Sequence, residues 1–176
     1  MRRGAPVRRV GRLTVALVGV CLGAAACGGA GSSTPDKGPV GAALTLGGGG
    51  EQVAVTAVRV VDPARPADRS DLPHAGNRLV GVELRVTDTG TTPVDQNLDS
   101  QTHLQDASGE TFHTAGFHIS AGPEFPGGHA RLAPGQTQVG YATFVVPRSA
   151  RLTAARVTLA AGFDSSTGTW DVGTHP

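Results

Sequence analysis

The chain has few residues of the kinds that stabilise or functionalise small exported proteins by covalent or metal chemistry. Among 176 residues there are two cysteines, one methionine, one tryptophan and one tyrosine. Both cysteines, Cys21 and Cys27, lie near the N-terminus. The rest of the chain therefore cannot form the disulfide framework usual in small secreted proteins, and its fold must depend on packing. Copper(I) binding by the rest of the chain is disfavoured, because Met1 is the only methionine and no cysteine follows Cys27, so soft sulfur ligands are missing there.

The N-terminus has the order of features typical of a secretory signal. Five arginines and no acidic residue occupy positions 1–12, residues 13–22 are almost wholly apolar, and residues 23–26 are small. The apolar run is much shorter than the roughly 20 residues that a membrane-spanning helix needs. Two arginine pairs precede it, but Gly11 and Arg12 follow the second pair where twin-arginine export needs apolar residues. General secretion is therefore favoured.

Cys27 is the predicted lipid attachment point. Three alanines precede it and two glycines follow it, so the segment resembles a bacterial lipoprotein signal, although Ala24 stands where leucine is commonest. Ordinary signal peptidase would cut the same bond, and the two alternatives differ only in whether Cys27 receives a diacylglycerol thioether. An unmodified Cys27 would leave an odd reactive thiol, which favours lipidation. We therefore expect a protein anchored by its lipid on the extracytoplasmic face of the cell membrane.

The charge of the predicted mature chain argues against two classes of partner. Removing the five leader arginines leaves ten basic and fourteen acidic residues, a net charge near −4, and Lys37 is the single lysine. Nucleic-acid binding needs a clustered basic surface, and a polybasic membrane patch needs the same. Residues 1–26 are the predicted signal peptide, residues 27–41 the lipidated cysteine with a flexible Gly/Ser-rich linker, and residues 42–173 a single domain.

The domain has the alternating pattern of β-strands. In residues 78–88, Val80, Val82, Leu84 and Val86 alternate with small or polar residues, which predicts a half-buried strand. Residues 51–62 alternate with a phase slip that indicates a bulge, and residues 138–147 are apolar on both faces, which suits a central strand ending at Pro147. Five shorter candidates are residues 42–46, 102–106, 110–114, 156–161 and 169–173. Turn signals between the strands, and no helical periodicity after the signal, predict an all-β antiparallel sandwich.

Three segments resemble the immunoglobulin-like domain of unknown function found on Gram-positive envelope lipoproteins. They are residues 78–88 followed by a Thr-Gly turn, a Leu-x-Asp-x-x-Gly-x-x-aromatic hairpin, and a Pro-Gly-Gln turn leading to Gly-x-x-x-Phe-x-Val-Pro. The matching residues are Leu104, Asp106, Gly109 and Phe112, then Pro134, Gly135, Gln136, Gly140, Phe144, Val146 and Pro147. Asp88 stands where the family usually has asparagine. The resemblance implies an immunoglobulin-like fold and an envelope location, and it carries over no catalytic residues. We expect Phe112, Phe144, Phe163 and Trp170 to pack in the core.

The residues that could carry chemistry do not form a recognisable constellation. His113, His118 and His129 lie in or beside the long segment 113–131, which could hold zinc or copper(II), but no tight His-x-His spacing supports this. Asp95 and Asp99 lie close in sequence but are typical turn formers. No Gly-x-Ser-x-Gly motif accompanies Ser149 or Ser165, and the glycines at 47–50 join two strands rather than form a phosphate loop. We therefore expect neither an enzyme nor a bound cofactor.

The segment 113–131 is the most unusual feature of the predicted domain, because connections of this length are commonly functional. With Phe117, His118 and Phe125 it could form a partner-binding lip at one end of the sandwich, or it could be a mobile surface loop. The sequence therefore predicts a non-catalytic binding or scaffolding module that recognises another envelope component. The alternative is a small-ligand or metal carrier that uses His113, His118 and His129.

Overall fold

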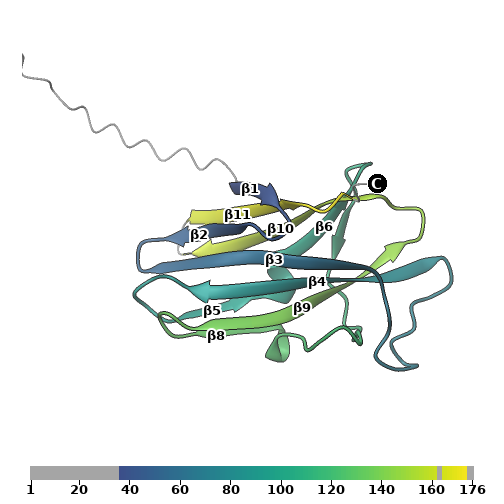
Figure 1. Ribbon diagram of the computed structural model, residues 1–176, viewed down its shortest axis with the longest axis horizontal. Coiled ribbons are helices and arrows are strands. Elements are labelled where there is room, and N and C mark those ends of the chain that lie inside the picture. Colours follow the sequence, from purple (N-terminus) through teal and green to yellow (C-terminus); the bar gives the residue numbers. More distant parts are fainter. Residues whose placement is uncertain (1–35, 162–163, 174–176) are drawn as a thin grey trace, which may run out of the picture. The chain divides into compact units, whose positions relative to one another are not determined.

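The computed structural model describes residues 36–161 and 164–173, whose regular secondary structure is almost all β-strand (Figure 1). The strands are β1 (Asp36–Pro39), β2 (Ala43–Gly48), β3 (Glu51–Ala64), β4 (Asn77–Asp88), β5 (Val94–Asn97), β6 (Thr102–Asp106), β7 (Thr111–His113), β8 (His129–Leu132), β9 (Thr137–Pro147), β10 (Leu152–Ala161) and β11 (Asp164–Asp171). A four-residue helix, α1 (Leu98–Gln101), and a 3-10 turn, η1 (Pro126–Gly128), complete the described elements.

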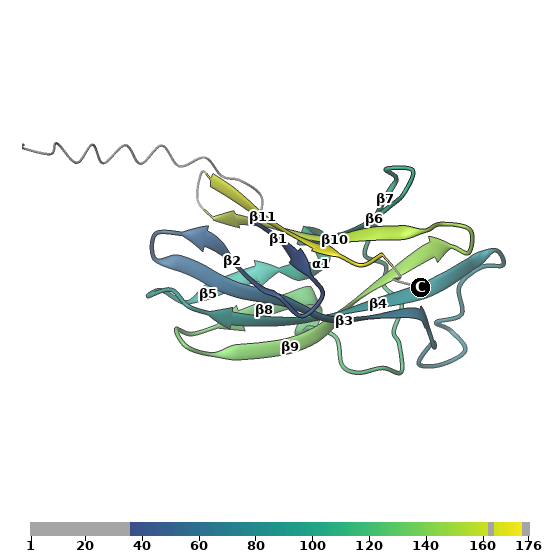
Figure 2. The same cartoon turned by 45° about the horizontal axis from the view of Figure 1, so that its top comes forward.

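The strands form an immunoglobulin-like β-sandwich, as the sequence predicts. One sheet has the order β1-β11-β10-β6-β7 and the other β2-β3-β4-β9, while β5 and β8 pair as a separate ribbon. Figure 2 shows the first sheet above the second. The pairing is antiparallel, apart from β1 beside β11. Both ends of the described chain therefore meet in one sheet.

Alternation along the strands places valine and leucine between the two sheets. On β4, the four side chains expected inside, Val80 to Val86 in steps of two, have no exposed surface. Phe112, Phe144 and Trp170 are also buried, as expected, and Trp170 donates a hydrogen bond from Nε1 to the carbonyl oxygen of Ala42 at 2.8 Å. An indole N–H removed from water needs such a partner. Phe163 lies outside the described residues.

All eight predicted strands are present, and three strands were not predicted. The phase slip in β3 is a bulge, since its register against β4 shifts between Ala57 and Arg59. The missed strands, β1, β5 and β8, have four residues each, which is too short for a period of two to stand out in the sequence. Because β1 pairs with β11, residues 36–39 belong to the sandwich and not to the flexible linker predicted over 27–41. The predicted signal peptide and Cys27, the predicted lipidation site, lie outside the described residues.

The prediction that residues 138–147 form a central strand was wrong. β9 pairs with β4 on one side only and is therefore an edge strand of its sheet. It is nevertheless apolar on both faces because residues 114–125 fold against it. The amide of Ala115 donates to the carbonyl oxygen of Thr143, and the amide of Tyr141 donates to that of Pro123. The segment thus buries the outer face of β9 at Tyr141 and Thr143 and occupies part of its edge.

Candidate functional site

The long segment 113–131 is largely part of the sandwich rather than a lip beside it. Its first residue ends β7, and its last three begin β8. Phe125, a predicted lip residue, is 2% exposed and belongs to the main core, where its ring and backbone lie against Gly140. A Cβ at position 140 would come within 2.8 Å of that ring, so glycine permits this close approach. Phe117 is partly buried.

Residues 114–124 and the β3–β4 loop, residues 65–76, together cover one end of the outer face of the four-stranded sheet. Pro66 forms a β-bridge with Ile119, the amide of Ala67 donates to the carbonyl oxygen of His118, and that of Ser120 donates to Arg65. Beneath the two segments lies a second apolar cluster separate from the main core. Its buried members are Ala64, Leu79, Ile119 and Tyr141, with Val61, Phe117, Ala121 and Val145 packed around them.

His118 lies at the junction of the two loops, between two carboxylates. Its Nδ1 lies 3.2 Å from Asp71 Oδ1, which also accepts the His118 amide at 2.9 Å, and its Nε2 lies 3.5 Å from Glu124 Oε2. The hydrogen bond to Asp71, followed by the charge of Glu124, raises the pKa of His118 above its ordinary value. Burial raises the pKa of Glu124, and His118 opposes that effect. Sequence inspection did not identify Asp71, which lies 47 residues before its partner.

The three histidines proposed as metal ligands contact different partners. His129 Nδ1 lies 2.6 Å from Asp95 Oδ1, whereas His113 stacks edge-on against His103 with ring centroids 4.6 Å apart. Over residues 36–161 and 164–173, no three histidine, cysteine or acidic residues are grouped so that they could hold one metal ion. The described geometry therefore gives the metal-carrier alternative no support.

The carboxylate pair considered from the sequence is also divided between two environments. Asp95 accepts from His129 and from Arg131 Nε, and these hydrogen bonds, His129 first, lower its pKa. Asp99 lies on α1 next to Gly128 of η1, and burial raises the pKa of Asp99. Their unlike pKa directions arise from structural contacts and not from a shared site.

None of the helices in the described part of the chain has the length and apolar character to cross a membrane.

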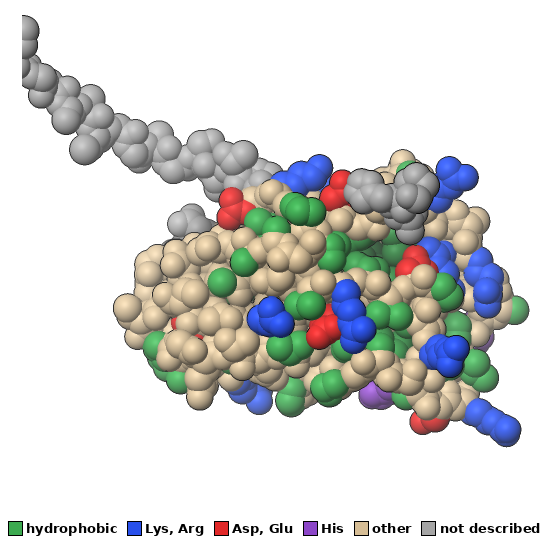
Figure 3. Space-filling model, in the orientation of Figure 1, with side chains coloured by type: hydrophobic (Ala, Val, Ile, Leu, Met, Phe, Trp, Pro, Cys, Tyr) green, Lys and Arg blue, Asp and Glu red, His purple; other side chains and the backbone are tan. Residues whose placement is uncertain are grey.

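A groove opens along the side of the sandwich, between β3 and the ends of β1 and β11. It consists of two adjoining hollows of about 640 and 410 Å³ that share Val60 and Val172. We call it the β3 groove. Its lining residues are Lys37, Gly38, Pro39, Val40, Arg59, Val60, Asp62, Arg78, Ala150, Arg151, Leu152, Asp171, Val172 and Gly173. Figure 3 shows hydrophobic side chains in this hollow with charged side chains around it.

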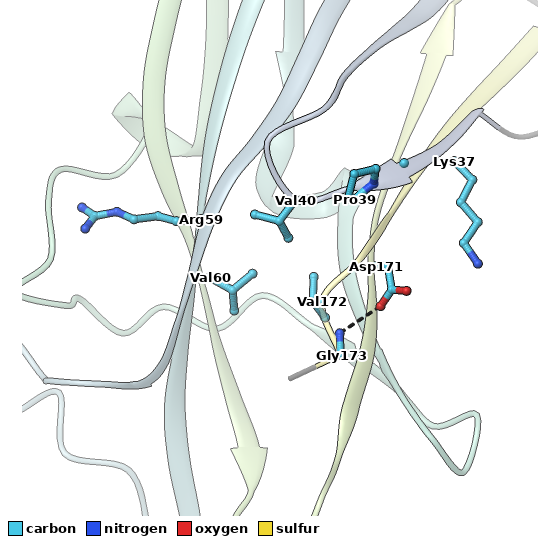
Figure 4. A pocket seen from close by; sticks show the side chains of 9 residues that line it. Lys37, Pro39, Val40, Arg59, Val60, Asp171, Val172 and Gly173 are labelled. Carbon is cyan, nitrogen blue, oxygen red and sulfur yellow. Dashed lines mark hydrogen bonds between the residues drawn. The ribbon is translucent and has the colours of Figure 1, made fainter. Parts of the chain in front are cut away.

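The floor of the groove is apolar, and a hydrogen-bonded arginine lines one of its ends. Val40, Val60 and Val172 come from three separate segments and point toward one another (Figure 4). At one end, Arg78 donates to both carboxylate oxygens of Asp62, at 2.6 and 3.0 Å, and to the carbonyl oxygens of Pro147 and Ala150. The hydrogen bond to Asp62 raises the pKa of Arg78. This arginine consequently orders the groove wall.

Comparison with known proteins supports the fold. MPT63, a secreted protein from Mycobacterium tuberculosis, superposes with a TM-score of 0.54 and 19% identity over 80% of this chain and 99% of its own. A candidate lipoprotein of Bacillus subtilis, ycdA, gives 0.51 and 17% over 73% of this chain and 38% of its own. Neither a protein-family model nor a curated protein matches the sequence. At these identities the similarity extends to the β-sandwich alone.

Proposed function

We propose that the protein is a non-catalytic binding module of the cell envelope, anchored on the outer face of the cytoplasmic membrane by a lipid on Cys27. The observation that carries this proposal is the order of the N-terminal features: a basic, apolar and small-residue leader, Cys27, and a sandwich that begins nine residues later at Asp36. A short tether of this kind keeps a folded domain close to the bilayer. Two acyl chains bind a membrane durably, whereas one chain does so marginally.

Two further observations support a binding role. The β3 groove combines an apolar floor with charged residues at its rim, which is the usual composition of a recognition site. Two proteins that share the fold with a TM-score above 0.5 are described as a secreted protein and a candidate lipoprotein. Both descriptions agree with an extracytoplasmic setting for this chain, and neither names an activity.

The lipid anchor is tested by replacing Cys27 with serine in the producing bacterium. We expect wild-type protein to sediment with membranes and to show the mass of the chain from Cys27 plus its lipid, and Cys27→Ser to move into the soluble fraction. Cys21→Ser is the matched control, because Cys21 belongs to the removed leader and its loss should change nothing. Sedimentation of the Cys27→Ser protein with membranes, or an unmodified N-terminal Cys27, would overturn the anchor.

The binding role is tested by chemical crosslinking in intact cells, followed by purification of the wild-type protein and of the released Cys27→Ser form. We expect one envelope protein to be recovered with the anchored form, in an amount nearly equal to that of the anchored form itself. Recovery of no defined partner at any crosslinker length would contradict a binding module.

A further inference from the structure

The second half of β3 presents an open sheet edge. β2 pairs only with residues Glu51–Thr56, and the amide of Gly41 then donates to the carbonyl oxygen of Ala57 at 2.7 Å. Beyond that point the chain leaves toward β1 in the other sheet. From Val58 to Ala64, β3 pairs with β4 on one side, and no strand of residues 36–161 and 164–173 pairs with its other side. Main-chain donors and acceptors along such an edge can pair with an incoming strand.

The β3 groove runs beside this open edge. Val60 lines both hollows, and its side chain points toward Val172 on the facing sheet (Figure 4). A strand added to β3 would place every second side chain toward this apolar floor and the others toward solvent. Main-chain hydrogen bonds would supply affinity, and the hollows would select the inward side chains. At about 3.3 Å per residue, four residues of a peptide would pair along the edge from Val58 to Val61, so a peptide of about seven residues covers this edge and extends beyond it.

The charges around the groove favour an acidic occupant. Its lining contains four basic residues, Lys37, Arg59, Arg78 and Arg151, against Asp62 and Asp171. Arg78 is paired with Asp62 and Arg59 with Glu83, while Lys37 and Arg151 form no ion pair with the described residues. The predicted mature chain carries a net charge near −4, so this basic excess is local. Complementary charge steers binding and suppresses wrong partners.

We propose that the edge of β3 at Val58–Val61 binds an extended acidic segment of a partner protein by β-strand addition, with alternate apolar side chains of that segment in the β3 groove. The proposal rests on the proposed function, since it names the surface and the partner class that such a binding module uses. An occupant of this kind explains together the open edge, the apolar floor and the basic rim.

The test uses a defined peptide and the purified full-length chain in detergent. The probe is an acetylated and amidated heptapeptide of alternating glutamate and valine, beginning and ending with glutamate. Amide hydrogen exchange is followed residue by residue by NMR. We expect exchange of the outward-facing amides among Val58–Val61 to slow by about tenfold or more when the peptide is saturating. The same peptide N-methylated at alternate residues should give no protection, because it cannot donate the ladder hydrogen bonds.

Charge-reversal variants separate the groove from general electrostatics. Lys37→Glu with Arg151→Glu reverses the two exposed charges at the rim and should weaken the glutamate–valine peptide by about tenfold, given the modest value of each exposed charge. The control, Arg65→Glu with Arg69→Glu, makes the same change in net charge at two exposed residues of the β3–β4 loop. It should leave affinity nearly unchanged. A lysine–valine peptide should prefer the first variant to the wild type.

Each other outcome overturns the proposal. Protection of Val58–Val61 that rises with protein concentration and needs no peptide would mean that a second copy occupies the edge. Protection by phosphatidylglycerol vesicles but not by peptide would mean that the surface contacts lipid. Peptide binding without protection of this edge would place the site elsewhere. The proposed function would survive those three results if crosslinking still recovers a partner, and would fail separately if it recovers none.

Discussion

On one side of the four-stranded sheet, the edge and outer face of β9 are covered by residues 114–125. On the other side, the half of β3 after Ala57 has no strand against its edge in the described residues. The covered edge receives backbone hydrogen bonds at Tyr141 and Thr143 and packing from Phe125. The open edge instead borders an apolar groove. Because exposed edges template pairing with other chains, a protein that covers one edge and leaves another beside a groove is suited to pairing there.

The largest effect on this comparison is expected from removing the ring of Phe125, which packs residues 114–125 against β9. Phe125→Ala should lower the free energy of unfolding by about 3–5 kcal/mol, because it removes a fully buried ring that packs against the backbone of β9. Urea unfolding measures the change. The amide of Tyr141 should also exchange faster, since its acceptor lies in the same segment. Leu72→Ala, at a side chain 60% exposed, is the control and should change little. A loss below about 1 kcal/mol for Phe125→Ala would contradict the assignment of this segment to the core.

A smaller loss of stability is expected where residues 114–125 contact the outer face of β4. A Cβ at Gly81 would collide with Ile119 Cδ1 and come within 3.2 Å of Tyr141. Gly81→Ala should therefore destabilise the protein by about 1–3 kcal/mol. Adding Ile119→Val removes the colliding methyl group and should restore part of that loss in a double-mutant cycle. Gly116→Ala is the matched control, in the segment that contains Ile119, because a Cβ at position 116 meets no atom within 4 Å. Equal losses in the single and double variants would show that Ile119 is not the contact.

The smallest effect should come from the titration of His118, which ties the covering segment to the β3–β4 loop. Its pKa is raised in the folded protein, chiefly by Asp71, so its contribution is complete below the ordinary value of 6.5 and is lost as pH rises through the raised pKa. The amides of Ala67 and Ser120 join the two loops. After correction for intrinsic rates, their protection should fall as pH rises from below 6.5 through the raised pKa of His118, and this dependence should disappear in His118→Gln. Protection that rises over this range would contradict the role of the protonated imidazole.

Sequence patterns predicted the long strands well because their side chains alternate between core and surface. The eight predicted strands, the bulge in β3 and the burial of Phe144 and Trp170 all follow from local periodicity and apolar character. Three of the short strands, β1, β5 and β8, were missed because their sequences carry too little of that alternation. β5 and β8 contain only four residues each, and they are strands because Val94 lies opposite Leu132 and Asn97 opposite His129. No local pattern encodes a pairing across that separation.

The candidate sites were predicted less well than the fold. Phe125 resembled an exposed loop aromatic because glycine and proline surround it, yet its ring is in the core. The three histidines were grouped by their closeness in sequence, and the structure gives each a different neighbour. The β3 groove was not identified at all, because its floor combines Val40, Val60 and Val172 from three distant segments.

By itself, the sequence determined which side chains of each long strand lie inside, and hence that the chain folds as a β-sandwich, because strand periodicity and solvent exclusion act residue by residue. It also contains the basic, apolar and small-residue order and the Cys27 on which the proposed anchor depends. The tertiary structure alone decided which edges are covered, where the second apolar cluster lies and that a groove opens beside β3. Those features arise when segments far apart in the chain meet, and their energies depend on contacts that no local pattern records.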